Sequence, residues 1–265
     1  MTGIYDRVRD FWNRNPCGST HIASPPGTLE YFHECDAYFR RVYPYLDDFL
    51  DLDSLKGRAV MEIGLGSGYT LHRIAQASRM CVGLDLSEET LRLNARRKAF
   101  FGLNVALIQG SATDIPLADD SLDAVVTIGC LHHIPDIGKA VDEIHRVLKP
   151  GGVLKGMVYN RHSWRAMVYI PLARKLHPKF RGKTRQECIN VMYDGSGNPY
   201  GMVYSRKEIA RILRGFGNVR FKIENFLGEE VVPRLGAAIP RTFWLATLGK
   251  ILGLDLYFTA RKAGR

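Results

Sequence analysis

Short apolar runs alternate with segments of helical periodicity from residue 58 onward. The runs predict seven strands, at Arg58–Gly64, Met80–Leu86, Val105–Gln109, Leu122–Gly129, Val153–Tyr159, Val219–Phe226 and Leu256–Arg261. Between them, apolar residues at helical spacing predict four helices, at 69–77, 88–101, 137–148 and 206–216. Strands that alternate with helices predict an α/β fold, in which helices cover both faces of a mostly parallel sheet.

Three segments fall outside this alternation, at 1–55, 160–204 and 228–254. The last two follow the fifth and sixth strands, so they begin at the edge of the sheet where ligands bind in doubly wound folds. We therefore expect a lid and a cap around a ligand site. The predicted parts are an N-terminal helical lid at 1–55, the core at 56–160, a basic cap insertion at 161–204, and the rest of the core at 205–265 with a second insertion at 228–254.

The composition is that of a globular protein, with 46% hydrophobic and 24% charged residues. We find no apolar run of about 18 residues, so the sequence predicts no membrane-spanning helix. Residues 1–15 lack the apolar stretch of a secretory signal. The five cysteines are odd in number and scattered, at Cys17, Cys35, Cys81, Cys130 and Cys188. We expect reduced thiols in the cytoplasm and no metal site, because no pair has the spacing of zinc ligands.

The positive charge is concentrated in the C-terminal part of the chain. The net charge is +10, and residues 161–265 alone carry 20 basic and 7 acidic side chains, a difference of +13. Eight basic residues and no acidic one occur between Arg161 and Arg185. Nucleic acid, an anionic small substrate or an acidic membrane surface would each explain this bias, and so would a solvated basic face.

A glycine-rich turn joins the first predicted strand to the first helix. In Glu62-Ile63-Gly64-Leu65-Gly66-Ser67-Gly68, glycines at alternate positions allow a ligand to approach the backbone closely. A dinucleotide-binding fingerprint is the obvious alternative, but it requires glycine where this chain has Tyr69. Asp85 ends the second strand and suits ribose hydroxyls in either interpretation.

Later blocks separate the two interpretations. They are Gly83–Ser87, Gly110–Ala112, Ile115–Leu117, Asp119–Asp123, Leu131–Asp136 and Arg146–Gly152. In this order, with the glycine turn before them, they resemble the class I S-adenosylmethionine-dependent methyltransferases, specifically the type 11 methyltransferase domain. The resemblance implies a Rossmann-like, doubly wound, seven-stranded sheet whose last strand is antiparallel. It also implies S-adenosyl-L-methionine as the cofactor.

The family implies a role for each matching residue. Gly64, Gly66 and Gly68 would surround the methionine moiety and Glu62 its ammonium group, while Asp85 would accept from the ribose hydroxyls. Leu86, Ser111 and Ala112 would contact the adenine, although the family usually has aspartate where this chain has Ser111. Gly129 and Cys130 would lie close to the reactive sulfonium.

Four side chains are candidates for a general base, because they follow the fourth and fifth strands. They are His132, His133, Tyr159 and His162, of which we favour His133. A base would deprotonate an alcohol or phenol, so we predict methyl transfer to oxygen of a small or amphiphilic acceptor that can carry an anionic group. Transfer to nitrogen or carbon, or an inactive cofactor-binding subunit, is the alternative. Nucleic acid is disfavoured, since no Asn-Pro-Pro-Tyr motif follows the fourth strand.

The lid and cap supply the candidate acceptor contacts, which are Trp12, Arg161, Arg165 and Tyr204. In the cap, Trp164, Met167, Val168, Leu172 and Leu176 recur at helical spacing opposite basic residues. The second insertion repeats this character with Leu235, Ile239, Phe243, Trp244, Leu248 and Leu252 beside Arg234, Arg241 and Lys250. Such helices suit peripheral contact with a membrane surface or an amphiphilic substrate, or pack their apolar stripe on the domain. The sequence indicates no oligomeric state.

Overall fold

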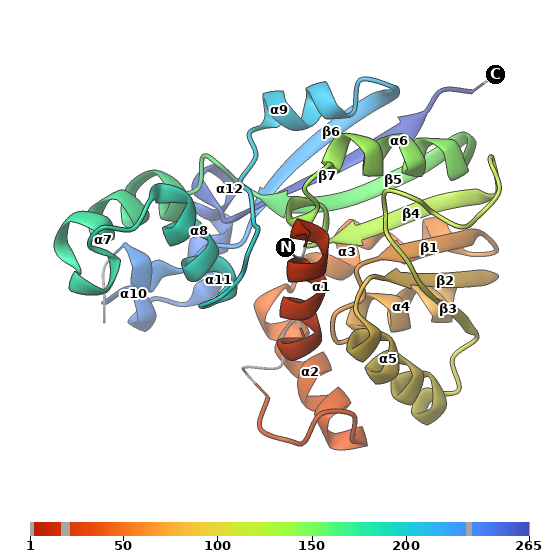
Figure 1. The fold of residues 1–265 in the computed structure, drawn as a ribbon, viewed down its shortest axis with the longest axis horizontal. Helices are drawn as coiled ribbons and strands as arrows, with labels where there is room; N and C mark the ends of the chain where they lie inside the picture. The colour runs from red at the N-terminus through yellow and green to blue at the C-terminus, as the bar shows by residue number, and fades with distance from the viewer. Residues whose placement is uncertain (1–2, 17–21, 232–234, 265) are drawn as a thin grey trace.

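The computed structural model describes residues 3–16, 22–231 and 235–264, so Cys17 and Arg234 lie outside the described residues. A seven-stranded sheet forms the centre of the molecule, in the order β3-β2-β1-β4-β5-β7-β6 (Figure 1). The strands are β1 Ala59–Ile63, β2 Met80–Asp85, β3 Val105–Gln109, β4 Leu122–Ile128, β5 Leu148–Tyr159, β6 Phe216–Glu224 and β7 Asp255–Lys262. β7 runs antiparallel to both of its neighbours, β5 and β6. The predicted fold class is confirmed.

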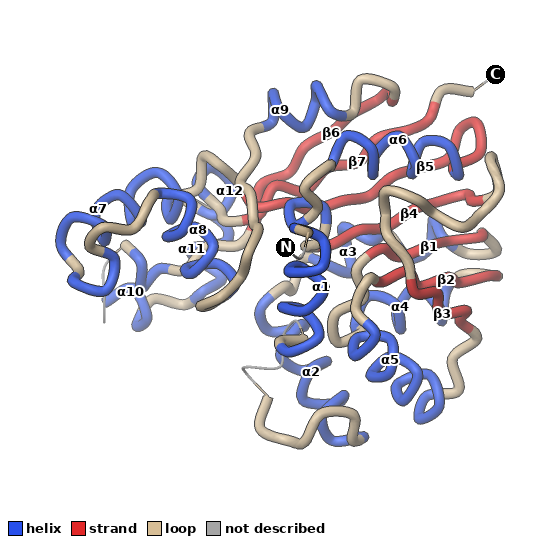
Figure 2. The backbone as a smooth tube through the Cα atoms, in the orientation of Figure 1, coloured by secondary structure: helices blue, strands red, loops and turns tan. Residues whose placement is uncertain are grey.

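Helices pack on both faces of this sheet (Figure 2). The core helices are α4 Tyr69–Ala77, α5 Glu88–Phe101, α6 Ile137–Val147 and α9 Arg206–Ile212. Successive residues of the buried strand β1 point to opposite faces, so Val60 packs in the core on the side of α4 and Met61 in the core on the side of α6. The sheet is therefore buried on both sides, as its apolar strands require.

Local signals explain where the helices begin and end. The Ser87 side chain accepts a hydrogen bond from the Thr90 amide at 3.1 Å, and Glu88 and Glu89 lie in the first turn of α5. The same helix ends at Gly102, which has a φ of 60°.

Two predicted boundaries were wrong. β5 begins at Leu148 and not at Val153, because Leu148 already pairs with Leu122 before an irregularity in the ladder. The Pro150-Gly151-Gly152 sequence therefore lies inside the strand and not in a turn before it. Similarly, α9 ends at Ile212, and Phe216 begins β6 by pairing with Lys262.

The lid consists of α1 Ile4–Arg14, α2 Leu29–Val42 and α3 Leu46–Leu50. Arg97 of α5 holds α2 in place: its buried guanidinium lies 2.7 Å from the Asp36 carboxylate. The same side chain donates to the Ser67 carbonyl in the glycine turn at 3.0 Å. α1 is attached by a hydrogen bond from the Ser87 hydroxyl to Asn13 Oδ1 at 2.8 Å.

The cap projects from the core at the left of Figure 1. Its first insertion contains a π-helical turn at Arg165–Tyr169, followed by α7 Ile170–Leu176 and α8 Arg185–Asp194. The second contains α10 Leu235–Ala238, α11 Arg241–Ala246 and α12 Gly249–Leu252. The two insertions meet where the Trp164 indole donates to the Glu230 carbonyl at 3.1 Å. Among the described residues, no helix has the length and hydropathy to cross a membrane.

Candidate cofactor and acceptor pocket

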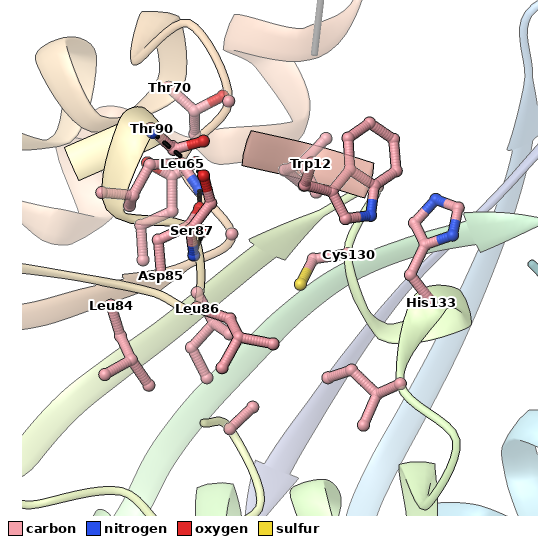
Figure 3. Close-up of a pocket in the computed structure, with 18 of the residues that line it drawn as sticks. Trp12, Leu65, Thr70, Leu84, Asp85, Leu86, Ser87, Thr90, Cys130 and His133 are labelled. Atoms are coloured by element: carbon pink, nitrogen blue, oxygen red, sulfur yellow. Dashed lines mark hydrogen bonds between the residues drawn. The ribbon is translucent and has the colours of Figure 1, made fainter. Parts of the chain in front are cut away.

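A pocket opens at the carboxyl ends of β1, β2, β4 and β5, beneath α1 (Figure 3). Asp85 lies on one side, Trp12 and His133 lie on the other, and Cys130 lies between them. Twelve of the eighteen predicted site residues line it: Trp12, Glu62, Gly64, Gly66, Asp85, Leu86, Ser111, Ala112, Gly129, Cys130, His133 and Tyr159. Residues predicted to bind the cofactor and residues predicted to contact the acceptor therefore line the same pocket.

The glycine turn needs its glycines because the backbone there is both left-handed and crowded. Gly64 has a φ of 78°, and a Cβ at this position would lie 2.4 Å from the Cβ of Cys130. Any larger residue would push the turn away from the end of β4. The turn therefore leaves backbone exposed to the pocket as a cradle for a ligand. Gly68 does not line the pocket; it has a φ of 82° and caps α4.

Glu62 presents a buried carboxylate to this cradle. Its Oε2 has no hydrogen-bond partner in the described part of the chain, although the residue is 2% exposed and lines the pocket. Burial raises the pKa of Glu62 well above its usual range, and the charge of Asp85 adds to the effect. A buried hydrogen-bond acceptor without a partner destabilises the folded protein. We therefore expect a bound molecule to donate a hydrogen bond to this oxygen.

Asp85 is fixed by two backbone amides. Leu65 N donates to its Oδ2 and Ser87 N to its Oδ1, each at 2.8 Å. Burial raises the pKa of Asp85 to about 6, against the lowering effect of these amides. Each carboxylate oxygen can accept a further hydrogen bond, which is what a pair of ribose hydroxyls would supply. The orphaned Glu62 oxygen and the glycine cradle also fit the amino-acid end of S-adenosylmethionine.

The predicted adenine contacts lie at the same end of the pocket. Ser111 Oγ is 2.7 Å from Thr113 Oγ1 and accepts from the Thr113 amide at 3.2 Å. This hydroxyl is hydrogen-bonded within its own turn, so it is a poor substitute for the aspartate that the family usually has at this position. The backbone of Ala112 and the side chain of Leu86 remain the predicted contacts with the base.

At the opposite end, His133 lies among polar groups. Its Nδ1 is 2.9 Å from the Tyr200 carbonyl oxygen, and its ring packs edge-on against Trp12 at 4.9 Å between centroids. A carbonyl can only accept, so Nδ1 must donate, and the neutral ring then carries its lone pair on Nε2. Nε2 lies 3.6 Å from Oδ1 of Asp194.

Asp194 joins His133 to Tyr159. The Tyr159 hydroxyl donates to Asp194 Oδ1 at 2.5 Å, and Asn198 Nδ2 donates to Oδ2 at 2.8 Å. Both Asp194 and His133 are nearly buried and line the pocket. A carboxylate in this position would stabilise the imidazolium that forms when Nε2 takes a proton. With Nδ1 held by the Tyr200 carbonyl and Nε2 near a carboxylate, His133 remains a candidate for a general base.

Several predicted site residues lie elsewhere. His132 is fully buried behind Tyr159, with 3.8 Å between ring centroids, and burial lowers its pKa well below the usual range. Arg161 forms two hydrogen bonds with Glu208, at 2.7 and 2.9 Å, and Arg165 pairs with Glu230. His162 and Tyr204 do not line the pocket either, and Tyr204 packs in the core. These five residues therefore do not line the pocket.

The polar partners of His133 and much of the pocket wall were not predicted from the sequence. Asp194 and Tyr200 come from the cap, far from His133 in the chain, and no motif marks them. Aromatic residues of the lid and α4 also line the pocket, namely Tyr5, Phe39, Tyr43 and Tyr69. The rings of Phe39 and Tyr69 stack at 5.2 Å. The density of aromatic residues in the lid was the available signal.

The sheet order, the glycine turn and the two buried carboxylates are the features expected of a class I S-adenosylmethionine-dependent methyltransferase. More particularly, residues 61–155 match the model of the family described as "Methyltransferase domain". The predicted family resemblance is confirmed.

Known proteins support this assignment over different lengths. A Mycolicibacterium smegmatis protein, named a probable S-adenosylmethionine-dependent methyltransferase, is 38% identical over 40% of this chain and 39% of its own. Demethylmenaquinone methyltransferase of Staphylococcus aureus is 26% identical over 70% of this chain and 78% of its own. The chain spans about two fifths of the length of the first curated relatives that it matches.

A solved structure shows the same fold over the whole chain. It is phosphoethanolamine N-methyltransferase 2 of Haemonchus contortus, in complex with phosphomonomethylethanolamine and S-adenosylhomocysteine. The TM-score is 0.61 at 17% identity, over 100% of this chain and 61% of that one.

Proposed function

We propose that this protein transfers a methyl group from S-adenosylmethionine to a small or amphiphilic acceptor with an apolar, planar body, at an oxygen atom. The observation that carries the proposal is the continuity of the pocket. The same pocket contains Glu62 and Asp85, whose carboxylates suit the cofactor, and His133, Asp194 and Tyr159, which include the candidate general base. Cys130 lies between these two groups of residues.

The protein would hold the cofactor by its own fixed groups. Glu62 would accept from the ammonium group and Asp85 from the ribose hydroxyls, with the Gly64–Gly66 backbone along the methionine chain. When bound, S-adenosylmethionine supplies an electrophilic methyl group on a sulfonium leaving group. The contribution of the chain is then alignment, exclusion of water by α1, and proton removal.

His133 is proposed as the general base. Its Nδ1 is committed to the Tyr200 carbonyl, so Nε2 carries the lone pair that would receive the proton of an acceptor hydroxyl. Asp194 would orient the ring and stabilise its charged form. An amine that is already nucleophilic would need no such group, which is why oxygen is preferred over nitrogen. A carbon acceptor activated by a neighbouring hydroxyl would use the same base.

The walls favour an apolar acceptor over an anionic one. Aromatic side chains make up much of the pocket wall, contributed by Trp12, Phe39, Tyr43, Tyr69 and Tyr159. Among the described lining residues, Arg9 is the one cation of the Lys and Arg type, and it already pairs with Asp6 at 3.1 Å. A relative named demethylmenaquinone methyltransferase is consistent with an aromatic acceptor.

The test begins with binding and continues with turnover. Titration calorimetry should show that S-adenosylmethionine and S-adenosylhomocysteine bind to the wild type and that Asp85→Ala weakens both. Release of S-adenosylhomocysteine would then be followed with phenols, hydroxyquinones, alcohols and amines as acceptors. Turnover of a phenol or hydroxyquinone that His133→Ala abolishes supports the proposal. A wild-type protein that binds neither cofactor form overturns it, and amine turnover insensitive to His133→Ala overturns the oxygen assignment.

A further inference from the structure

The outer side of the cap exposes the apolar stripe that the sequence analysis singled out. The turn at 165–169 and α7 bury Ala166 and Ile170. Met167, Val168, Leu172 and Leu176 are exposed instead, with 51% of Leu172 and 72% of Leu176 accessible. We call these four residues the cap stripe. A helix of a globular domain normally buries such a stripe, so packing on the domain does not account for this one.

The second insertion repeats this exposure. Leu235, Ile239, Phe243 and Ile251, on and around α10 to α12, are exposed large apolar residues as well. The two insertions contact each other at Trp164 and Glu230 and lie together at the left of Figure 1. Most of the large apolar side chains that the described chain exposes therefore belong to the cap.

Basic side chains accompany the cap stripe without carboxylate partners. Arg174, Lys175, Lys179, Arg181, Lys183 and Arg185 follow one another with no acidic residue between them. In the described ranges, no salt bridge involves any of these six, in contrast to Arg161 and Arg165. Arg174, Lys175 and Lys183 line one shallow depression with Pro171, Phe180 and Gly182. Unneutralised positive charge at this position favours an anionic partner.

We propose that this face of the cap docks on an anionic lipid bilayer. Aliphatic side chains of the cap stripe enter the boundary between headgroups and acyl chains, and the basic residues contact lipid phosphates. Among the exposed large apolar residues described in the cap, seven carry no aromatic ring and two, Tyr169 and Phe243, do. This face therefore offers little of the stacking platform of aromatic rings that single-stranded nucleic acids use. No residue of the cap stripe lines the pocket, so bilayer binding is independent of methyl transfer.

Vesicle co-sedimentation of the full chain tests the apolar part of the proposal. The protein should sediment with vesicles of phosphatidylcholine and phosphatidylglycerol, and weakly with phosphatidylcholine alone. The double variant Leu172→Glu with Leu176→Glu should lower the partition coefficient by about tenfold or more. Phe100→Glu is the matched control, since Phe100 is 52% exposed and belongs to α5, which lies on the other side of the molecule from α7 in Figure 1. It should leave partitioning unchanged.

A second pair of variants tests the charge. Arg174→Glu with Lys175→Glu should lower binding to the anionic vesicles by about tenfold while weak binding to neutral vesicles persists, and added salt should act in the same direction. Retained S-adenosylmethionine affinity and thermal unfolding temperature would show that these exposed substitutions keep the fold.

Four results would overturn the proposal. The first is failure to sediment with anionic vesicles. The second is a loss of vesicle binding in Phe100→Glu equal to that in the Leu172→Glu, Leu176→Glu variant. The third is vesicle binding that millimolar inorganic phosphate abolishes and that the stripe substitutions leave unchanged. The fourth is a dimer in solution that Leu172→Glu with Leu176→Glu dissociates, which would make a second copy of the chain the occupant of this face.

Discussion

Asp85 and Glu62 are held in a buried site where each carboxylate resists ionisation. Because the pKa of Asp85 is raised to about 6, this group changes charge within a convenient range of pH. Above that value the carboxylate can accept from both ribose hydroxyls, and below it one oxygen becomes a donor. The affinity for cofactor should therefore depend on pH in a way that identifies the residue.

We expect the dissociation constant of S-adenosylhomocysteine to rise as the pH falls through about 6. Asp85→Asn should weaken binding at pH 8 by about 2–4 kcal/mol, since it removes hydrogen bonds to a charged acceptor. It should also remove most of the pH dependence. Calorimetric titrations between pH 5 and 8 measure both effects. Equal pH slopes for the variant and the wild type would assign the titration to another group.

For the proposed base, His133→Ala should slow methyl transfer by about 10²–10⁴-fold while cofactor affinity stays close to that of the wild type. Asp194→Asn keeps the size of the side chain but loses the charge opposite Nε2. We expect a smaller loss of kcat than in His133→Ala, with the acceptor KM and the cofactor affinity close to those of the wild type. Steady-state rates over a range of acceptor concentrations would separate kcat from KM. A wild-type kcat in Asp194→Asn would reduce Asp194 to a structural role.

The sequence predicted the pocket residues beside the glycine turn better than those around His133. Glu62, Gly64 and Gly66 fall in one contiguous motif where β1 ends, and Asp85 falls in a second motif where β2 ends. By contrast, the Asp194 contact with His133 depends on how the cap folds back over β5, which no local pattern records. Arg165 was predicted to bind an acceptor, because the sequence does not show that Glu230 lies beside it.

At the scale of elements, apolar periodicity predicted all seven strands and the four core helices, because each buries a contiguous surface against the sheet. It failed at boundaries where pairing overrides local signals, as at Leu148 in β5. It also predicted the cap stripe but left its orientation open. The stripe residues have the spacing of a buried face, and the structure exposes them.

The attachment of α2 to the core gives a prediction for stability. Asp36→Ala leaves the buried guanidinium of Arg97 without its carboxylate, which should lower the free energy of unfolding by about 3–5 kcal/mol. Adding Arg97→Met should recover part of this loss, because the uncompensated charge is then removed. Urea unfolding measures both. Asp53→Ala is the control: it breaks a fully exposed ion pair with Lys56, and we expect no measurable change in the free energy of unfolding.

If Asp36→Ala changed the free energy of unfolding as little as Asp53→Ala does, other contacts would hold the lid on the core. The rings of Phe32 and Phe101, over which Arg97 lies at 4.8 and 5.6 Å, would be the next candidates.

For the whole molecule, Asp255 at the start of β7 links stability to pH. It is fully buried, and burial raises its pKa from 3.8 to about 7. Between these values the folded protein binds a proton that the unfolded chain releases, so the free energy of unfolding should fall as the pH rises from 4 to 8. The contribution is on the order of 2–4 kcal/mol. Asp255→Asn should flatten this dependence, as measured by urea unfolding at several pH values. A steeper fall in the variant would contradict the assignment.

β7 joins β6 to the rest of the sheet, so its position also limits when the sheet can assemble during synthesis. β5 and β6 are adjacent to β7 and not to each other, so both wait for residues 255–262 before their edges can pair. On the ribosome, β5 and β6 emerge before that segment, and until it follows them one edge of β5 and both edges of β6 have no neighbouring strand. Unpaired strand edges recruit other strands. Chaperone engagement with the nascent chain should therefore last from the emergence of β6 until β7 leaves the exit tunnel.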